Sequence, residues 1–226
     1  EYFHDNFYWF EIVGGGRKVL KKNIEDFLNW YYNREDFKES CMKKITWNSP
    51  VILSFALISL IALGLNTLTN GTTNQLIFSV YGGSLLNPLF YLRLFTHVLG
   101  HADLSHYMNN MLLFLLVGPM LEEKYGSQRL LIVILVVALV TGIAHIIIAP
   151  NTMLLGASGV VFAFILLSAV TGSKEGIPLT FIIVAVLYIG TQIYQGVFNV
   201  DNVSQLTHII GGIIGGVFGM TLRKSR

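Results

Sequence analysis

The sequence has few charged residues and a single cysteine. Charged residues make up 12% of its 226 residues and hydrophobic residues 53%, whereas soluble domains are about 25% charged. Cys41 stands alone, which excludes an internal disulfide and a cysteine-based metal cluster. The composition therefore predicts a polytopic membrane protein.

The few charges are unevenly distributed. Residues 1–49 contain 8 of the 15 Lys and Arg and 8 of the 13 Asp and Glu, and residues 50–226 contain the rest. Because residues 50–226 have no basic stripe, the net charge of +2 does not indicate nucleic-acid binding. We expect a cytoplasmic N-terminal region, 1–49, followed by a transmembrane domain, 50–226.

Apolar runs of membrane length recur through the second region. The predicted spans are 50–68, 104–121, 130–149, 154–171, 177–197 and 206–222. Ser49 fits the N-cap of the first helix and Pro50 its first helical position. The predicted fold class is all-α, a bundle of six transmembrane helices.

Basic residues predict how these spans are oriented. They lie before the first span, between the second and third, between the fourth and fifth, and after the sixth: Lys43, Lys44, Lys124, Arg129, Lys174, Arg223, Lys224 and Arg226. The opposite connections have only Arg93 as a basic residue. The positive-inside rule then places both termini in the cytoplasm of a cell-membrane protein. The apolar connection 69–103 is expected to lie partly in the outer leaflet.

A serine and a histidine stand out within the apolar spans. Ser158 lies between small residues in Gly156-Ala157-Ser158-Gly159, and His208 is the only histidine in the last three spans. Polar groups inside a membrane are costly and are functional candidates by default. Since a serine needs an adjacent base to act as a nucleophile, the pair predicts a serine hydrolase. No Asp or Glu is placed to orient His208, so we expect a Ser–His dyad with Phe162, one turn after Ser158, stacking on the imidazole.

Small residues explain how the fourth and sixth spans could approach each other. Gly212 and Gly216 share a helix face with His208, and a second, adjacent ladder follows it. That second ladder is Gly211, Gly215 and Gly219. Small residues at four-residue spacing let helix backbones approach closely. Ser158 and His208 also lie near the outer ends of their spans, so the pair is expected at one membrane level, opening toward the extracytoplasmic side.

The second predicted span offers donors for a developing oxyanion. His106 and Asn110 are four residues apart and share one helix face near the outer side. The alternative for Asn110 is a hydrogen bond that ties helices together. The backbone N–H of Ser158 could add a third donor.

The histidines also allow a metal-binding interpretation. His97, His101 and His106 could suit a metal or small-solute transporter, although Asp103 is the only acid nearby. The sequence has no H-E-x-x-H motif and no paired intramembrane aspartates, which disfavours metalloproteases and aspartyl proteases. His145 is interpreted as a packing residue. We expect no metal and no cofactor.

Four motifs in order resemble the rhomboid intramembrane serine proteases over about residues 50–222. They are HADLSHYMNN at 101–110, G-x-x-x-E-x-x-x-G at Gly118, Glu122 and Gly126, LGASGVVFAF at 155–164, and THIIGG at 207–212. The resemblance implies that Ser158 is the nucleophile, His208 the base, and His106 and Asn110 the oxyanion residues. Gly156 and Gly159 flank the nucleophile, and Glu122 and Arg93 are supporting residues.

The sequence departs from the family pattern at three positions. Leu92 stands where a Trp usually precedes Arg93, Thr207 stands where an Ala usually precedes the base, and Phe162 replaces a frequent Tyr. The resemblance implies cleavage of transmembrane-helix protein substrates in or near the bilayer, without metal or nucleotide. A rhomboid-like protein that binds transmembrane helices without cutting them is the alternative, although such relatives usually lack the serine or the histidine.

Overall fold

The computed structural model describes residues 26, 47–171, 177, 179–198 and 202–224. Its elements from residue 47 onward are α3 (Pro50–Leu68), the π-helix η1 (Asn74–Phe78), α4 (Pro88–Thr96), the 3₁₀-helix η2 (His97–Leu99), α5 (Leu104–Tyr125), α6 (Ser127–Ile148), α7 (Ser158–Thr171), α8 (Leu179–Phe198) and α9 (Asn202–Lys224). Within the described residues the only β-structure is an isolated bridge between Val80 and Leu154. The all-α prediction is confirmed.

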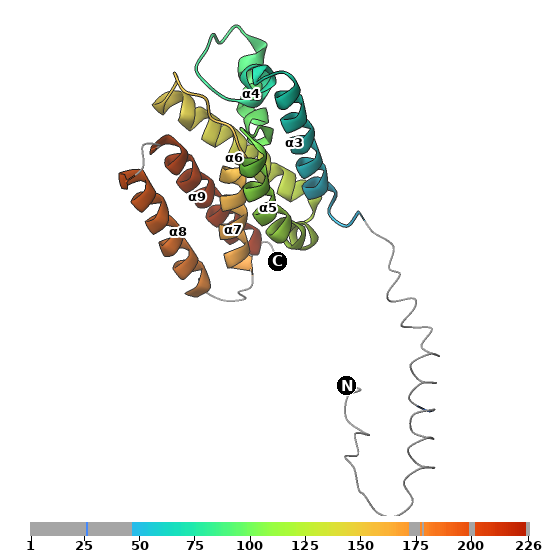
Figure 1. Cartoon of the computed structure of the whole chain (residues 1–226). Helices are drawn as coiled ribbons and strands as arrows, with labels where there is room; N and C mark the ends of the chain where they lie inside the picture. The colour runs from blue at the N-terminus through green and yellow to red at the C-terminus, as the bar shows by residue number, and fades with distance from the viewer. Residues whose placement is uncertain (1–25, 27–46, 172–176, 178, 199–201, 225–226) are drawn as a thin grey trace, which may run out of the picture. The chain divides into compact units, whose positions relative to one another are not determined.

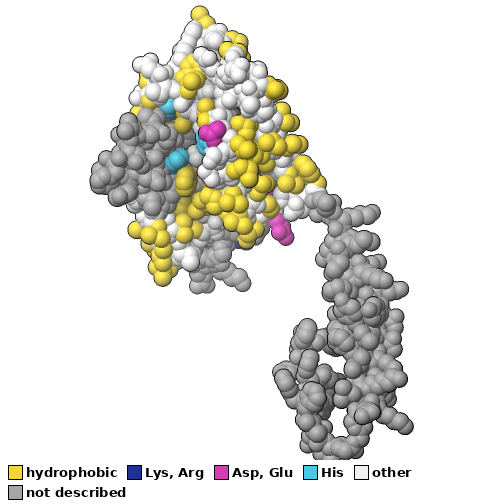
Figure 2. Space-filling model, in the orientation of Figure 1, with side chains coloured by type: hydrophobic (Ala, Val, Ile, Leu, Met, Phe, Trp, Pro, Cys, Tyr) yellow, Lys and Arg dark blue, Asp and Glu magenta, His cyan; other side chains and the backbone are white. Residues whose placement is uncertain are grey.

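Two of the described helices, α3 and α6, are long and apolar enough to cross a membrane. Two further apolar stretches, Ser158–Val170 in α7 and Leu206–Leu222 in α9, are shorter. Hydrophobic side chains spread over the visible face of the bundle, with few charged groups among them (Figure 2). The number of six membrane spans stays a prediction.

Helix α7 is the centre of the bundle and packs against α5, α6, α8 and α9 (Figure 1). Its side chains are among the most completely buried in the described residues. Val160, Ala163, Phe164 and Leu167 have no exposed surface. Phe164 stacks on Phe114 of α5, with ring centroids 5.3 Å apart. The helix that begins with Ser158 is therefore held on several sides.

The predicted fourth span, 154–171, is a helix only from Ser158 onward. Gly156 has φ +127, a backbone conformation that interrupts a helix and that other residues rarely adopt. Leu154 forms the isolated bridge to Val80 instead of a helical turn. The chain thus enters α7 as an extended segment directly before the serine.

The connection 69–103, predicted as a loop, contains η1, α4 and η2. Helix α4 begins with an N-cap, Asn87, followed by a proline. The Leu89 backbone N–H donates to Asn87 Oδ1 at 3.0 Å, and Pro88 is the first helical residue.

The start of α3 differs from the prediction at Ser49. Ser49 occupies the N-cap position, but its side chain makes no capping hydrogen bond. The carboxylate of Glu122, at the end of α5, accepts the Val51 and Ile52 backbone N–H groups instead, each at 3.0 Å. Ser127 Oγ donates to the same carboxylate at 2.7 Å. One buried acid therefore ties α3, α5 and α6 together at one end of the bundle.

The predicted division into 1–49 and 50–226 stays a prediction. Apart from residue 26, residues 1–46 lie outside the described part of the chain. The residues described from Trp47 onward belong to one unit, Trp47–Arg226.

Candidate active site

Ser158 and His208 meet in the fold although 50 residues separate them. Ser158 is the first residue of α7, and His208 lies on α9. The Ser158 Oγ and the His208 Nε2 are 2.7 Å apart and hydrogen bonded. Both residues are half-buried. When His208 carries its proton on Nδ1, the serine hydroxyl donates to Nε2, which is the arrangement that a nucleophile and its base require.

The close approach of α7 and α9 makes this hydrogen bond possible. A Cβ on Gly211 would collide with the backbone of Gly159, and a Cβ on Gly215 would collide with the carbonyl of Ala163. The helices therefore touch backbone to backbone at Gly211 and Gly215, and Gly219 packs against the side chains of Leu167 and Val170. We call this ladder of three glycines the α7–α9 seam. The other predicted ladder faces elsewhere, since Gly216 packs near Phe181 of α8.

Gly156 brings the donors of α5 to the serine. A Cβ on Gly156 would lie 2.8 Å from His106 Nε2 and 3.8 Å from Asn110 Nδ2. The side chains of His106 and Asn110 thus converge on the segment that leads into Ser158. Only a glycine leaves this space open while also adopting the positive φ.

His106 and Asn110 present hydrogen-bond donors at this point. The Ala102 backbone N–H points at His106 Nδ1, 3.4 Å away, so the ring proton is assigned to Nε2, the atom beside Gly156. Asp103 caps α5 by accepting the His106 backbone N–H at 2.8 Å, which fixes the first turn of the helix. The Asn110 Nδ2 is buried and has no acceptor among the described residues.

Phe162 lies one turn after Ser158 and contacts the imidazole. The Phe162 and His208 ring centroids are 4.8 Å apart, with an interplanar angle of 47°. The two rings are therefore in contact in a tilted arrangement. Seven predicted site residues therefore come together: Ser158, His208, His106, Asn110, Gly156, Gly159 and Phe162.

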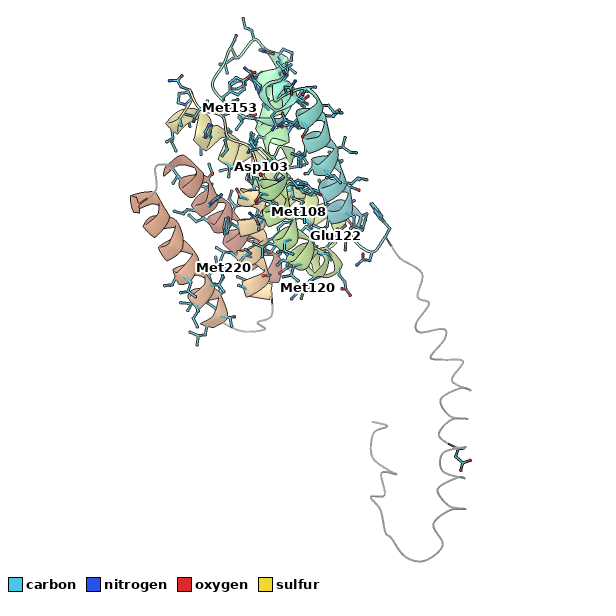
Figure 3. The ribbon with its side chains drawn as sticks, viewed as in Figure 1. Asp103, Met108, Met120, Glu122, Met153 and Met220 are labelled. Carbon is cyan, nitrogen blue, oxygen red and sulfur yellow. The ribbon has the colours of Figure 1, made fainter. Side chains whose placement is uncertain are left out.

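Two predicted supporting residues, Glu122 and Arg93, lie elsewhere. Glu122 belongs to the end of α5 that is remote from the serine, opposite the end marked by Asp103 (Figure 3). Arg93 is buried in α4, where its guanidinium lies 3.9 Å from the Tyr81 ring centroid and Nη1 donates to Tyr81 Oη at 2.6 Å. This contact to Tyr81 holds the connection 69–103 without the missing tryptophan.

His97, which the sequence marks only as a possible metal ligand, contributes to the site through its backbone. Its carbonyl accepts the Gly156 N–H at 2.9 Å and so holds the segment before the serine. Its Nε2 lies 3.4 Å from Thr141 Oγ1. Nothing in the sequence pattern marks a carbonyl contact of this kind, because every residue carries the same backbone group.

The histidines of the connection 69–103 are uncharged at neutral pH. Burial lowers the pKa of His97 to about 4 and that of His101 also to about 4. The His101 ring packs edge-on against His106, with centroids 5.1 Å apart. Within the described residues, no three His, Cys, Asp or Glu side chains gather closely enough to hold a metal ion. His145 is buried and hydrogen bonded to the Thr152 carbonyl at 2.9 Å, as a packing residue would be.

The arrangement contains the parts that acyl transfer requires. A serine hydroxyl is hydrogen bonded to an imidazole, and two side-chain donors converge beside the serine backbone. Such donors stabilise the oxyanion of a tetrahedral intermediate.

Comparisons with known proteins identify a family and several related sequences. A family model described as "Rhomboid domain" matches residues 89–225. Rhomboid-related protein 1 of Caenorhabditis elegans is 33% identical over 129 residues, 53% of this chain and 36% of its own length. Rhomboid protease GluP of Bacillus subtilis is 28% identical over 173 residues, 73% of this chain and 33% of its own length. Rhomboid-related protein 2 of Mus musculus is 29% identical over 161 residues, 62% of this chain and 53% of its own length.

The chain spans between about a third and a half of the length of these relatives. The matched domain contains every residue of the site described above. The resemblance seen in the sequence is therefore confirmed, and with it the membrane-embedded helical bundle. This chain belongs to the rhomboid family.

Proposed function

We propose that this protein is an intramembrane serine protease that hydrolyses peptide bonds in or near the transmembrane helices of its substrates. The observation that carries the proposal is the hydrogen bond of 2.7 Å between Ser158 Oγ and His208 Nε2. The name of the Bacillus subtilis relative, a rhomboid protease, supports the same activity.

In the proposed mechanism His208 is the general base. Its Nε2 accepts the hydroxyl proton while Ser158 Oγ attacks the carbonyl carbon of the scissile bond. His106 Nε2–H, Asn110 Nδ2–H and the Ser158 backbone N–H donate to the resulting oxyanion. The intermediate collapses when His208 gives the proton to the leaving amine. A water molecule, deprotonated by His208, then hydrolyses the acyl-enzyme and regenerates Ser158.

The proposed membrane topology follows from the basic residues. Both termini lie in the cytoplasm of a cell-membrane protein, so α7 and α9 begin at the extracytoplasmic side. Ser158 and His208 are both close to those ends, and the serine is only half-buried, as a hydrolytic nucleophile must be. A substrate helix would approach from the lipid bilayer, which makes membrane-spanning proteins the expected partners.

Labelling with a fluorophosphonate probe tests the nucleophile directly. The purified protein should form a covalent adduct at Ser158, and Ser158→Ala should abolish it. His208→Ala should reduce it strongly, because the serine loses its base. Ser168→Ala is the matched control: Ser168 is on the same helix, but its hydroxyl donates to the Ile165 carbonyl at 2.8 Å. A metal chelator should leave labelling unchanged.

Cleavage of a transmembrane reporter in proteoliposomes completes the test. Ser158→Ala and His208→Ala should each stop cleavage while Ser168→Ala cleaves normally. A folded wild-type protein that is neither labelled nor able to cleave would overturn the proposal. Retained binding of the reporter helix in that case would point to a rhomboid-like protein that binds helices without cutting them.

A further inference from the structure

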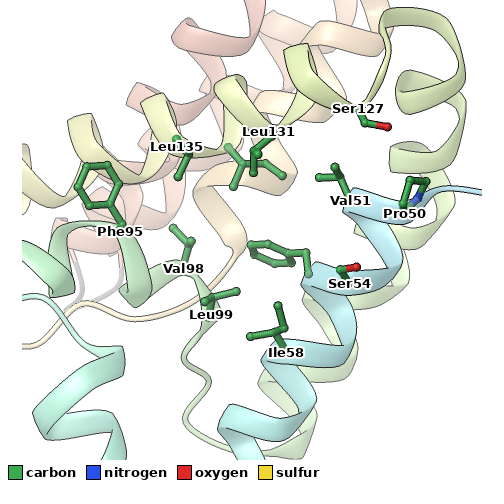
Figure 4. A pocket seen from close by; sticks show the side chains of 12 residues that line it. Pro50, Val51, Ser54, Ile58, Phe95, Val98, Leu99, Ser127, Leu131 and Leu135 are labelled. Carbon is green, nitrogen blue, oxygen red and sulfur yellow. The ribbon is translucent and has the colours of Figure 1, made fainter.

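A cavity of about 500 Å³ lies between α3, the α4–η2 segment and α6 (Figure 4), and neither Ser158 nor His208 lines it. Its lining comes from all three: Pro50, Val51, Ser54, Phe55 and Ile58 of α3, Phe95, Val98 and Leu99 of α4 and η2, and Ser127, Leu131, Ile134 and Leu135 of α6. Its volume falls in the range of about 300–1,000 Å³ that is typical of ligand sites. The proposed function does not use this space.

The walls of the cavity are apolar. Ser54 and Ser127 provide its only polar side chains, and no titratable group lines it. Ser127 Oγ already donates to the Glu122 carboxylate at 2.7 Å, which leaves little that would hold water. Apolar cavities stay dry and accept hydrophobic guests. The chemistry of the walls therefore favours a hydrocarbon occupant.

The cavity is continuous with the surface that the protein presents to lipid. Its two helical walls, α3 and α6, are the described helices that are long and apolar enough to cross a membrane. Ile58, Leu131 and Leu135 line the cavity and are also exposed at the surface, at 47%, 45% and 41% of their full area. The opening is thus formed by exposed apolar side chains of these two helices, which are expected to face lipid.

The dimensions match one leaflet. From Pro50 to Ile58 the α3 wall rises about 12 Å at 1.5 Å per residue, and half of the hydrocarbon core is about 15 Å thick. The end of the cavity away from the start of α3 is lined by Phe95, Val98 and Leu99. The other end lies near the start of α3, where the Glu122 carboxylate accepts the Val51 N–H. A single acyl chain is slender enough to enter.

We propose that this cavity binds one acyl chain of a phospholipid from the leaflet in which α3 and α6 begin. In the topology proposed above this is the cytoplasmic leaflet. The α4–η2 segment fills the space between α3 and α6 toward the extracytoplasmic side. The acyl chain fills the space between the same two helices toward the cytoplasmic side. The bound chain packs on Val98 and Leu99, next to His97, whose carbonyl holds Gly156. Its occupancy therefore stabilises the segment that supports the site.

Photolabelling of the full chain in lipid nanodiscs tests the proposal. The probe is phosphatidylcholine with a diazirine on one acyl chain, present at increasing mole fraction, and adducts are located by peptide mass spectrometry. We expect labelling of the α3 and α6 residues that line the cavity to saturate at low probe fraction. Labelling of Leu112 and Leu116, exposed on α5, should rise in proportion to the probe.

A cavity-filling variant gives the decisive comparison. Leu131→Trp places a larger side chain in the cavity and should remove the saturable labelling, whereas Ile132→Trp, at the adjacent exposed position, should retain it. Ser54→Leu fills the cavity from the α3 side and serves if Leu131→Trp does not fold. Wild-type protein stripped of lipid should gain in Tm when phosphatidylcholine is added back, and Leu131→Trp should lose that gain.

Proportional labelling at α3 and α6, unchanged in both filling variants, would overturn the proposal and leave only bulk lipid contact. The readouts are labelling and Tm, so this result is independent of whether the protein proves to be a protease.

Discussion

The α7–α9 seam and the α3–α6 side of the bundle are built in opposite ways. Along the seam, two backbones touch, and Gly211 and Gly215 leave no room for a single additional carbon atom. Between α3 and α6 the helices stand apart, with the α4–η2 segment and a cavity of about 500 Å³ between them.

The difference follows from what each side positions. The seam positions Ser158 and His208, whose side chains meet at 2.7 Å. The sequence identifies no third residue that would orient the histidine. Direct backbone contact can hold the pair because it leaves the two helices little freedom to shift. The α3–α6 side holds no such pair. It is joined by one polar node, the Glu122 carboxylate, and by apolar contacts that tolerate substitution.

The largest effect is expected at the seam. Gly215→Ala forces a methyl group against the Ala163 carbonyl, so α9 must move away from α7. Overpacking of this kind costs about 1–3 kcal/mol, and a shift of about 1 Å at the dyad can cost on the order of 10²-fold in rate. Fluorophosphonate labelling rates and thermal unfolding of the purified protein measure both losses.

Gly64→Ala is the control on α3, because Gly64 is exposed and an added Cβ would meet nothing within 4 Å. It should leave labelling unchanged and preserve or slightly raise the unfolding temperature, since alanine favours a helix by about 1 kcal/mol over glycine. If Gly215→Ala and Gly64→Ala had equal labelling rates and unfolding temperatures, the seam would not be tightly packed in the way described.

An effect of comparable size on the rate, without the loss of stability, tests whether α5 contributes chemistry to the seam. Asn110→Ala removes a buried donor beside Gly156 and should lower kcat by about 10²–10³-fold, with little change in KM. Asn109→Ala, at the adjacent exposed position, should have no effect. Steady-state cleavage of a transmembrane reporter measures both variants. If Asn110→Ala lowered only the unfolding temperature, Asn110 would be a residue that ties helices together.

The residues of the α7–α9 seam could be predicted from the sequence better than the features of the α3–α6 side. Ser158, His208 and the glycine ladder are visible as local patterns, because small and polar residues are unusual in apolar helices. Which ladder meets α7 was not visible, since Gly211 and Gly212 lie on adjacent faces. The contact between the His97 carbonyl and Gly156 joins two distant segments through the backbone, which carries no residue-specific signal.

The α3–α6 side was harder to predict for a related reason. Ser49 looked like the cap of α3, and a local pattern favoured it. The actual partner, Glu122, comes from about 70 residues away along the chain, and only tertiary packing brings it to the Val51 and Ile52 N–H groups. The cavity likewise arises from the spacing of three elements and has no sequence pattern of its own.

A smaller effect is therefore expected on stability at Glu122. Glu122→Gln replaces one acceptor oxygen by an NH₂ group, so a backbone N–H of α3 or the Ser127 hydroxyl loses its partner. An unpaired buried donor costs about 1–3 kcal/mol, while the dyad at the other end of the bundle should keep its rate in molecules that remain folded. Glu123→Gln, on the exposed face next to it, is the control. Thermal unfolding and labelling at low temperature separate stability from activity.

The smallest effect concerns orientation within the seam, because backbone contact alone fixes where α9 lies but not how the His208 ring turns. Phe162→Ala removes the ring that lies 4.8 Å from the imidazole. An aromatic pair contributes about 0.5–1.5 kcal/mol, so kcat/KM should fall by roughly two- to tenfold. Phe162→Tyr keeps the ring and should retain the rate. Unchanged cleavage in Phe162→Ala would mean that the Phe162 ring is not needed to orient the imidazole. The contact between the α7 and α9 backbones would then account for more of the precision of the dyad than the ring contact does.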